Sequence, residues 1–214
     1  MEILTLINSG SEQLKKNNIN SHILDAELLL AKTLNRKREE LIVSLNQKVK
    51  SEEVEKFKTL IDRRSRKEPI AYILEKKEFW SKNFFVNKDT LIPRPETELI
   101  VEKLVNIFAK KTIQILDIGT GSGCILLSLL SELRTSYGLG IDISQKAIKV
   151  AIRNSTKHQL RNRAKFYRKC FMKVNEHKFD LIVSNPPYIK KKDIKNLDDD
   201  IKKFEPKLAL DGGN

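Results

Sequence analysis

An apolar run that enters a glycine-rich turn and continues as an apolar helix constrains this fold more than any other feature. The run extends from Ile113 to Ile118 and carries β-branched residues, and the helical pattern extends from Ile125 to Leu133. The turn between them consists of Gly119, Thr120, Gly121, Ser122 and Gly123. Strand, glycine-rich turn and helix in this order begin a nucleotide-binding α/β unit, and glycines let the backbone approach a ligand closely.

The residues around this turn indicate which ligand it binds. The dinucleotide fingerprint needs glycine where this chain has Cys124, and no lysine follows in the register of a phosphate-binding loop. The pattern Asp-x-Gly-x-Gly-x-Gly suits a ligand without phosphates whose cationic end lies near an acid, and S-adenosylmethionine is such a ligand. We predict that residues 119–123 bind this cofactor and that Asp142, after a second strand, holds its ribose hydroxyls. The alternative is a glycine-rich turn with no ligand.

A second motif follows the apolar run 179–184, which is typical of a buried strand. It consists of Asn185, Pro186, Pro187 and Tyr188. Prolines fix φ, remove backbone donors and hold the preceding residue extended. The Asn185 side-chain oxygen and the Pro186 carbonyl then form a rigid pair of acceptors for the two hydrogens of an NH2 group, and Tyr188 offers a flat face for stacking. We predict that Asn185 and Pro186 are catalytic and that all four residues bind an amide or aromatic amine; the alternative is a proline-rich turn.

Strands and helices alternate through the second half of the chain. Apolar runs predict strands near 114–118, 137–141, 164–168 and 179–184, with helices near 123–133 and 144–156. This alternation favours a doubly wound parallel sheet. A further helix follows the Pro93-Arg94-Pro95 turn, with the predicted apolar face Ile100, Leu104, Ile107 and Phe108.

The first 72 residues have helical periodicity and predict a small bundle. Ser21 is a candidate N-cap for one helix. Another begins near Ser51, with Val54, Phe57 and Ile61 on one face. Aromatic and β-branched residues at 73–89 surround a polar break at 81–83 and predict a hairpin that links two domains.

The composition excludes several classes of protein. The chain has 41 Lys and Arg against 28 Asp and Glu, a net charge of +13. Such an excess indicates an acidic or nucleic-acid partner, although a general enrichment in lysine explains it equally well. Cys124 and Cys170 form no CxxC pair and the histidines are scattered, so we expect no disulfide framework and no metal site. No signal peptide or long apolar span is visible, which favours a soluble, cytoplasmic protein without membrane contact.

Four further segments are shared with one family of enzymes. They are 68–74, 78–80, 91–98 (Leu-Ile-Pro-Arg-Pro-Glu-Thr-Glu) and 204–213 (Phe-Glu-Pro-Lys-Leu-Ala-Leu-Asp-Gly-Gly). With the two motifs above, the chain resembles the release factor glutamine methyltransferases over nearly all of its length. The resemblance implies a class I S-adenosylmethionine-dependent methyltransferase fold, Rossmann-like with a mostly parallel sheet, preceded by a small helical domain. It also implies methylation of the glutamine amide in the Gly-Gly-Gln motif of peptide chain release factors.

The resemblance assigns roles to parts of the chain. It implies that residues 1–72 recognise the substrate, that 73–89 link the domains, and that 90–214 form the methyltransferase domain. The expected partner is a release factor near the ribosome, and the expected state is a monomer. The family usually has an acid and an aromatic pair after the third strand to cover adenine, whereas this chain has Lys169, Cys170 and Phe171. Cys170 is therefore the predicted adenine-side contact, and cofactor affinity is expected to be reduced.

Other readings of the sequence stay open. Within the same fold, the substrate is a ribosomal protein glutamine or an adenine amino group in DNA or RNA, since the Asn-Pro-Pro-Tyr chemistry is shared. The chain ends at Asn214 inside a family motif, and the resemblance implies more strands beyond it. We therefore expect a fragment whose fourth strand is unpaired on one side. The remaining alternative is a truncated, non-catalytic basic binding module.

Overall fold

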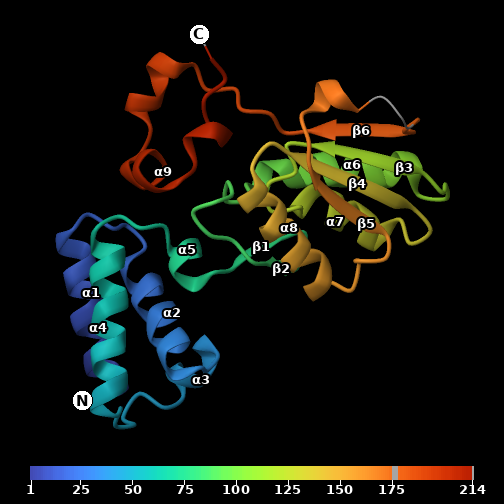
Figure 1. Cartoon of the computed structure of the whole chain (residues 1–214). Helices are drawn as coiled ribbons and strands as arrows, with labels where there is room; N and C mark the ends of the chain where they lie inside the picture. The colour runs from blue at the N-terminus through green and yellow to red at the C-terminus, as the bar shows by residue number, and fades with distance from the viewer. Residues whose placement is uncertain (175–177, 214) are drawn as a thin grey trace. The chain divides into compact units, whose positions relative to one another are not determined.

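A computed structural model describes residues 1–174 and 178–213 of the chain (Figure 1). The chain divides into two compact units. The first consists of Met1–Leu74 and Asp199–Phe204, and the second consists of Glu75–Asp198 and the chain from Glu205 onward. The predicted hairpin thus falls inside the second unit. Asn214, the last residue of the predicted methyltransferase domain, lies outside the described residues.

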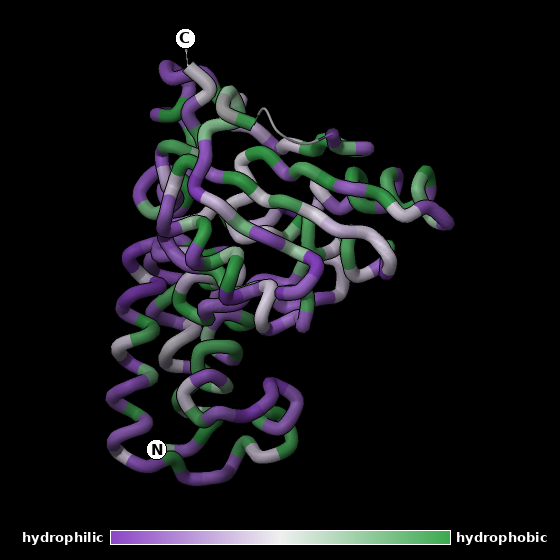
Figure 2. The backbone as a smooth tube through the Cα atoms, turned by 45° about the vertical axis from the view of Figure 1, so that its right-hand side comes forward, coloured by the Kyte–Doolittle hydropathy of each residue, from purple (hydrophilic) through white to green (hydrophobic). Residues whose placement is uncertain are grey.

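The first unit is helical, as predicted. Its helices are α1 (Ile3–Lys16), α2 (His22–Leu34), α3 (Arg38–Ile42), α4 (Ser51–Ser65), α5 (Ile70–Leu74) and α9 (Asp199–Phe204). Helix α4 begins at the predicted Ser51 and buries Val54, Phe57 and Ile61 in the core of this unit. Figure 2 shows the corresponding alternation of hydrophobic and hydrophilic residues along the N-terminal helices. Among the described residues, no helix is both long enough and apolar enough to cross a membrane.

Ser21 occupies the N-cap position of α2, as predicted, but does not cap the helix with its side chain. Ser21 immediately precedes α2, but its side chain makes no capping hydrogen bond and its ψ of 22° is not the extended conformation that a capping residue usually adopts. Its backbone carbonyl instead accepts from the Asp25 N–H at 2.8 Å. The helix therefore begins where the sequence indicates, without the side-chain bond that was expected.

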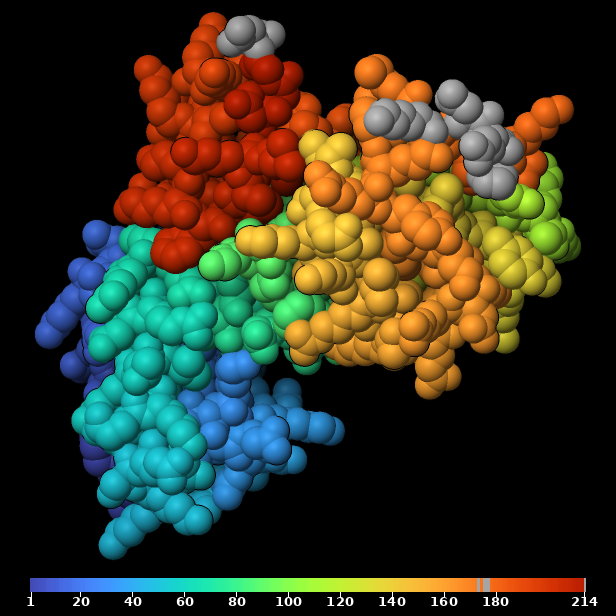
Figure 3. All heavy atoms as spheres, viewed as in Figure 1, coloured from blue at the N-terminus to red at the C-terminus, as the bar shows by residue number. Residues whose placement is uncertain are grey.

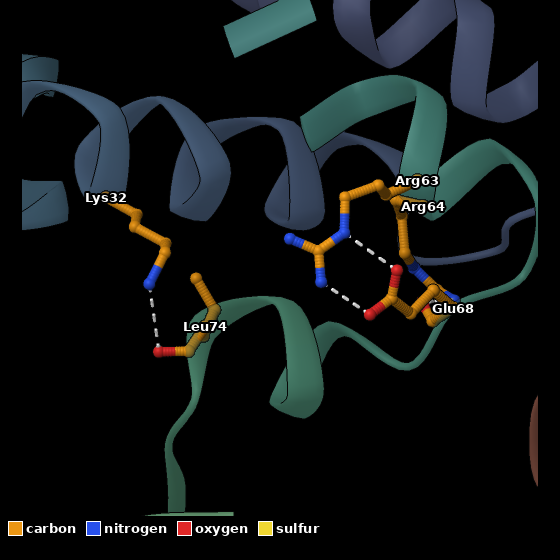
Figure 4. Close-up of polar contacts among 5 residues, drawn as sticks. All are labelled: Lys32, Arg63, Arg64, Glu68 and Leu74. Carbon is orange, nitrogen blue, oxygen red and sulfur yellow. Dashed lines mark hydrogen bonds and ion pairs between the residues drawn. The ribbon is translucent and has the colours of Figure 1, made fainter. Parts of the chain in front are cut away.

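A buried ion pair joins α2 to α4. The Arg64 Nε donates to Asp25 Oδ2 at 2.7 Å, and the side chains are only 10% and 3% exposed. Arg64 also donates to the Glu68 carbonyl at 3.0 Å, which fixes the turn that follows α4. Figure 4 shows the neighbouring contacts of this turn: Arg63 donates twice to the Glu68 carboxylate, and Lys32 donates to the Leu74 carbonyl.

The second unit opens with a two-stranded hairpin, β1 (Lys77–Phe79) and β2 (Lys82–Phe84). The expected polar break at 81–83 is displaced by one residue. Trp80 and Ser81 form the turn, with φ values of 51° and 53°, whereas Lys82 and Asn83 already belong to β2. Positive φ at both central residues matches the twist of paired strands, although such turns usually carry asparagine or glycine there.

A four-stranded parallel sheet forms the centre of this unit. Its strands are β3 (Gln114–Ile118), β4 (Tyr137–Asp142), β5 (Ala164–Arg168) and β6 (Leu181–Ser184), in the order β5-β4-β3-β6. The helices are α6 (Glu98–Phe108), α7 (Cys124–Glu132) and α8 (Gln145–Lys157), and the short 3-10 helices are η1 (Pro95–Thr97), η2 (Phe171–Lys173), η3 (Lys191–Asn196) and η4 (Lys207–Ala209). Every predicted strand and helix of this alternation is present, and the parallel sheet confirms the predicted α/β class.

The core of the second unit lies between the sheet and its helices. Ile115, Phe166 and Val183 from the strands pack in one cluster with residues of α6, α7 and α8. The predicted face of α6 is partly wrong, because Ile107 is 60% exposed and Val101 is the fully buried residue. Strand β6 pairs only with β3 among the described strands, and its Ile182 is 60% exposed, although the sequence predicts burial on both faces.

We expect Asp25→Ala to destabilise the first unit by about 3–5 kcal/mol, because it leaves the Arg64 guanidinium buried without its carboxylate. Chemical denaturation, followed by circular dichroism, measures this change. The matched control is Glu52→Ala, which removes an exposed i,i+4 partner of Lys56 on α4 and should leave the transition midpoint unchanged. Equal, small shifts in both variants would contradict the role given to the buried pair.

Candidate functional site

The two predicted motifs meet at one edge of the sheet. Strand β3 pairs in parallel with β4 on one side and with β6 on the other. The strands that follow β3 are therefore added first on one side of it and then on the other, so the strand order reverses at β3. Open α/β sheets bind ligands outside the carboxyl ends of strands at such a switch point. A cavity of about 580 Å³ lies there, and its lining includes Gly119, Asp142 and Asn185.

The glycine-rich turn has the backbone conformation that its sequence predicts. Gly119 and Gly121 have φ values of +71° and +54°, which favour glycine. A Cβ atom on Gly119 would have no heavy atom within 4 Å and would project into open space. The Thr120 Oγ1 donates to Asp117 Oδ2 at 2.6 Å, which anchors the turn to the end of β3. The turn therefore presents bare backbone to the cavity.

Asp117 is a buried acid beneath this turn. It is 1% exposed, and its Oδ1 accepts no hydrogen bond from the described residues. The pKa of this carboxyl is raised from 3.8 to about 6, chiefly by burial and in smaller part by the nearby Asp142 charge, whereas hydrogen bonds from Thr120 and from the Leu126 backbone lower it. Asp117 does not line the cavity, so its charge acts on a ligand only through the turn above it.

The Asp142 carboxylate is held by two backbone donors. Gly121 N–H donates to Oδ2 at 3.0 Å, and Ser144 N–H donates to Oδ1 at 2.8 Å. Ser144 caps α8 by accepting from the Ala147 N–H at 3.2 Å. Each carboxylate oxygen accepts more than one hydrogen bond, so Asp142 keeps acceptor capacity toward the cavity it lines.

The Asn-Pro-Pro-Tyr turn leaves β6 beside the glycine-rich turn. Ser184 Oγ donates to the Ile118 carbonyl at 2.9 Å, which joins the two strand ends. Asn185, Pro186 and Pro187 line the cavity, and the Asn185 side chain makes no hydrogen bond to another described residue. Tyr188 is 77% exposed and does not line the cavity, so its role as a stacking platform stays a prediction.

A short pairing supports this turn from the C-terminal side. Ile189 forms a parallel bridge with Asp211. The Ile189 N–H donates to the Leu210 carbonyl at 3.2 Å, and the Gly212 N–H donates to the Ile189 carbonyl at 2.9 Å. A Cβ atom on Gly212 would lie 2.9 Å from the Pro187 carbonyl oxygen, so this close approach requires glycine. The segment therefore fixes the backbone that follows the predicted catalytic residues.

The third wall of the cavity includes part of the segment 93–98, which the family resemblance places beside the active site, although none of its residues was predicted to bind a ligand. It is formed by parts of the segments 89–97 and 206–211. The Glu205 carboxylate, 1% exposed, joins them by accepting from the Ile92 N–H at 3.2 Å and from the Arg94 guanidinium. The only signal in the sequence was the family resemblance of both segments, because residues 111 positions apart show no common periodicity.

Two predicted cofactor contacts stay untested by the cavity lining. Gly123 and Cys170 do not line the cavity, whereas Lys169 and Phe171, the neighbours of Cys170, do. Cys124 also lines it, and burial raises the pKa of its thiol to about 12, so this cysteine is protonated and unsuited to nucleophilic chemistry. The assignments of Gly123 and Cys170 to the cofactor remain predictions.

Both parts of the chain match known protein families. Residues 5–74 match the PrmC N-terminal domain family, and residues 95–204 match the methyltransferase small domain family. A release factor glutamine methyltransferase of Buchnera aphidicola is 45% identical over 186 residues, covering 87% of this chain and 67% of the relative. That of Caulobacter vibrioides is 37% identical over 215 residues, covering 98% and 74%.

A bifunctional methyltransferase of Rickettsia typhi is 40% identical over 228 residues, covering 97% of this chain. The chain spans only 44% of that relative, so it corresponds to less than half of the bifunctional protein. The methyltransferase small domain match agrees with the parallel sheet and confirms the predicted methyltransferase fold.

We expect Asp117 to make the free energy of unfolding depend on pH between about 4 and 6. The folded state raises the pKa of this carboxyl to about 6, so it binds more protons than the unfolded state in this window. Stability from this group is therefore lost as pH rises, by on the order of 3 kcal/mol in total. Asp117→Asn keeps an acceptor for Thr120 and should be stabilised relative to the natural protein above pH 6.

Denaturant titrations of both proteins at pH 4, 5, 6 and 7 measure this difference, and contributions from all other groups cancel in it. A difference that is constant with pH would show that Asp117 titrates at its usual value.

Proposed function

The chain belongs to the release factor glutamine methyltransferase family, and from this membership we propose that it methylates the side-chain amide of a glutamine in a peptide chain release factor, with S-adenosylmethionine as the methyl donor. The observation that carries the proposal is the convergence of two motifs on one cavity. The glycine-rich turn and Asp142 lie on one side, and Asn185 and Pro186 lie on the other.

The residues of the cavity fit S-adenosylmethionine. Gly119 and Gly121 offer a surface free of side chains, Asp142 supplies negative charge for a cation, and Ile143 and Phe171 supply apolar surface. When bound, the cofactor supplies an electrophilic methyl group on a positively charged sulfur. Asp142 is the acceptor proposed for the ribose hydroxyls.

The residues on the β6 side are suited to activate an amide nitrogen as a nucleophile. The lone pair of an amide nitrogen is delocalised into its carbonyl, so the nitrogen attacks poorly. The Asn185 side-chain oxygen and the Pro186 carbonyl accept the two N–H bonds, which orients the nitrogen and stabilises the positive charge that develops on it. A rigid pair of acceptors acts in this way without a proton-transfer residue of its own.

The substrate glutamine is proposed to be that of the Gly-Gly-Gln motif, and the reaction is assigned to the cytoplasm, where release factors act. The match of residues 5–74 to the PrmC N-terminal domain family favours this substrate over a nucleic acid base, because it supplies a helical domain outside the methyltransferase fold. A ribosomal protein glutamine remains the second candidate substrate, since the same acceptors serve any carboxamide.

The decisive experiment incubates the full chain and labelled S-adenosylmethionine with a release factor. The matched substrate is the same release factor with alanine in place of the Gly-Gly-Gln glutamine. Label on the first protein and not on the second supports the proposal. Label on a ribosomal protein or on DNA alone, or no transfer to any substrate, contradicts it.

We expect Asn185→Ala to lower the methylation rate by on the order of a hundredfold or more, because it removes one acceptor that stabilises the transition state. The affinity for S-adenosylmethionine should change far less, as calorimetry can measure. Asn196→Ala, an exposed amide on η3, serves as the control. Turnover near that of the natural protein would remove Asn185 from the proposed mechanism.

We expect Asp142→Ala to weaken S-adenosylmethionine binding by about 1.5–3 kcal/mol, the range for a hydrogen bond to a charged group. Asp198→Ala removes the same charge at an exposed position and should leave the affinity unchanged. Equal affinities for the Asp142 variant and the natural protein would rule out the ribose contact.

A further inference from the structure

One buried amide connects two walls of the cavity without lining it. Asn154 lies on α8 and is 0% exposed. Its Nδ2 donates to the Ser122 carbonyl at 2.9 Å and to the Phe85 carbonyl at 3.0 Å, and its Oδ1 accepts from the Phe85 N–H at 2.7 Å. The partners fix the orientation of the amide, because the two carbonyls need donors and the Phe85 N–H needs an acceptor.

The two backbone segments held by Asn154 both lead into the cavity. Ser122 closes the glycine-rich turn and follows Gly121, whose N–H donates to the Asp142 carboxylate. Phe85 begins the segment that reaches the wall at residues 89–94. Phe85 is held a second time by α8, since the Arg153 guanidinium lies 3.4 Å from its ring centroid. Residues of α8 form part of the surface shown in Figure 3.

We propose that Asn154 is a positioning residue for cofactor binding, acting through the Ser122 carbonyl on the glycine-rich turn and through Phe85 on the opposite wall. This inference rests on the proposed function, which supplies the cofactor. Asn154 holds the turn in the position in which the Gly121 N–H donates to the Asp142 carboxylate. Asparagine alone among residues of this size provides two donors and one acceptor from a short side chain, whereas an aspartate would set its charge against two carbonyl oxygens.

The test compares Asn154→Asp with a matched control at the other end of the sheet. Ser136 is also 0% exposed and its Oγ accepts from the Ile113 N–H at 3.0 Å, but it precedes β4 at the end remote from the cavity. Calorimetry below the unfolding transition should show affinity for S-adenosylmethionine reduced about tenfold or more in Asn154→Asp and unchanged in Ser136→Ala. Unchanged affinity in Asn154→Asp would overturn the inference.

A double-variant cycle separates positioning from general loss of stability. If Asn154 acts through the turn on Asp142, the combined fold loss of affinity in Asn154→Asp with Asp142→Ala should be smaller than the product of the single losses. A combined loss equal to that product would overturn the proposed route.

A measurement on the natural protein keeps the inference testable if Asn154→Asp does not fold. Saturating S-adenosylmethionine should slow hydrogen exchange of the Phe85 amide more than that of the Ile113 amide, since only the first is bonded to Asn154. Equal slowing of both reports general stabilisation and overturns the inference. Failure of the natural protein to bind the cofactor overturns the proposed function together with this inference, whereas binding with equal slowing overturns the inference alone.

Discussion

The parallel pairing of β3 with both β4 and β6 is the constraint on which the site depends. In this register Ile118 lies opposite Ile141 on one side and Ser184 on the other. The glycine-rich turn and the Asn-Pro-Pro-Tyr turn therefore leave the sheet side by side, although residues 124–184 separate them in the chain. Parallel strands put their carboxyl ends at one edge, and a hydrogen bond from Ser184 to Ile118 locks the two ends together. An antiparallel β6 would send Asn185 to the opposite edge.

Buried polar side chains then hold the loops that the sheet cannot reach. Glu205 joins the segments on either side of the third wall, and Asn154 joins the glycine-rich turn to Phe85. Each is at most 4% exposed and satisfies backbone groups that would otherwise be buried without partners. Asp117 differs, because one of its oxygens has no partner among the described residues and its pKa is raised to about 6. The first two complete the hydrogen bonds of nearby backbone, whereas Asp117 stays a partly unpartnered acid beneath the glycine-rich turn.

Local sequence signals predicted the elements well and the contacts between them poorly. The strands β3 and β5 begin and end at the predicted residues, because apolar runs bounded by turns report burial directly. The Ser21 side-chain cap is absent because Ser21 has a ψ of 22° and not the extended backbone that lets a hydroxyl reach the first turn of α2. Glu205 and Asn154 were missed because their partners lie far away in sequence and no periodicity relates them. The need for glycine at position 140 was missed for the same reason. A Cβ atom there would lie 2.8 Å from Thr120 Oγ1, and the two residues come together only in the folded sheet.

The two sides of the site differ in how their charge responds to pH. The acceptors on the β6 side, an amide oxygen and a peptide carbonyl, do not titrate near neutral pH, so they present the same surface to a carboxamide across that range. On the other side, Asp117 lies buried beneath the glycine-rich turn without lining the cavity, and its pKa is raised to about 6. A cation bound there favours the ionised carboxyl, and by linkage its affinity rises as pH rises through that value. A pH dependence near 6 in the reaction would therefore arise from binding of the cationic donor, while orientation of the amide would stay independent of pH.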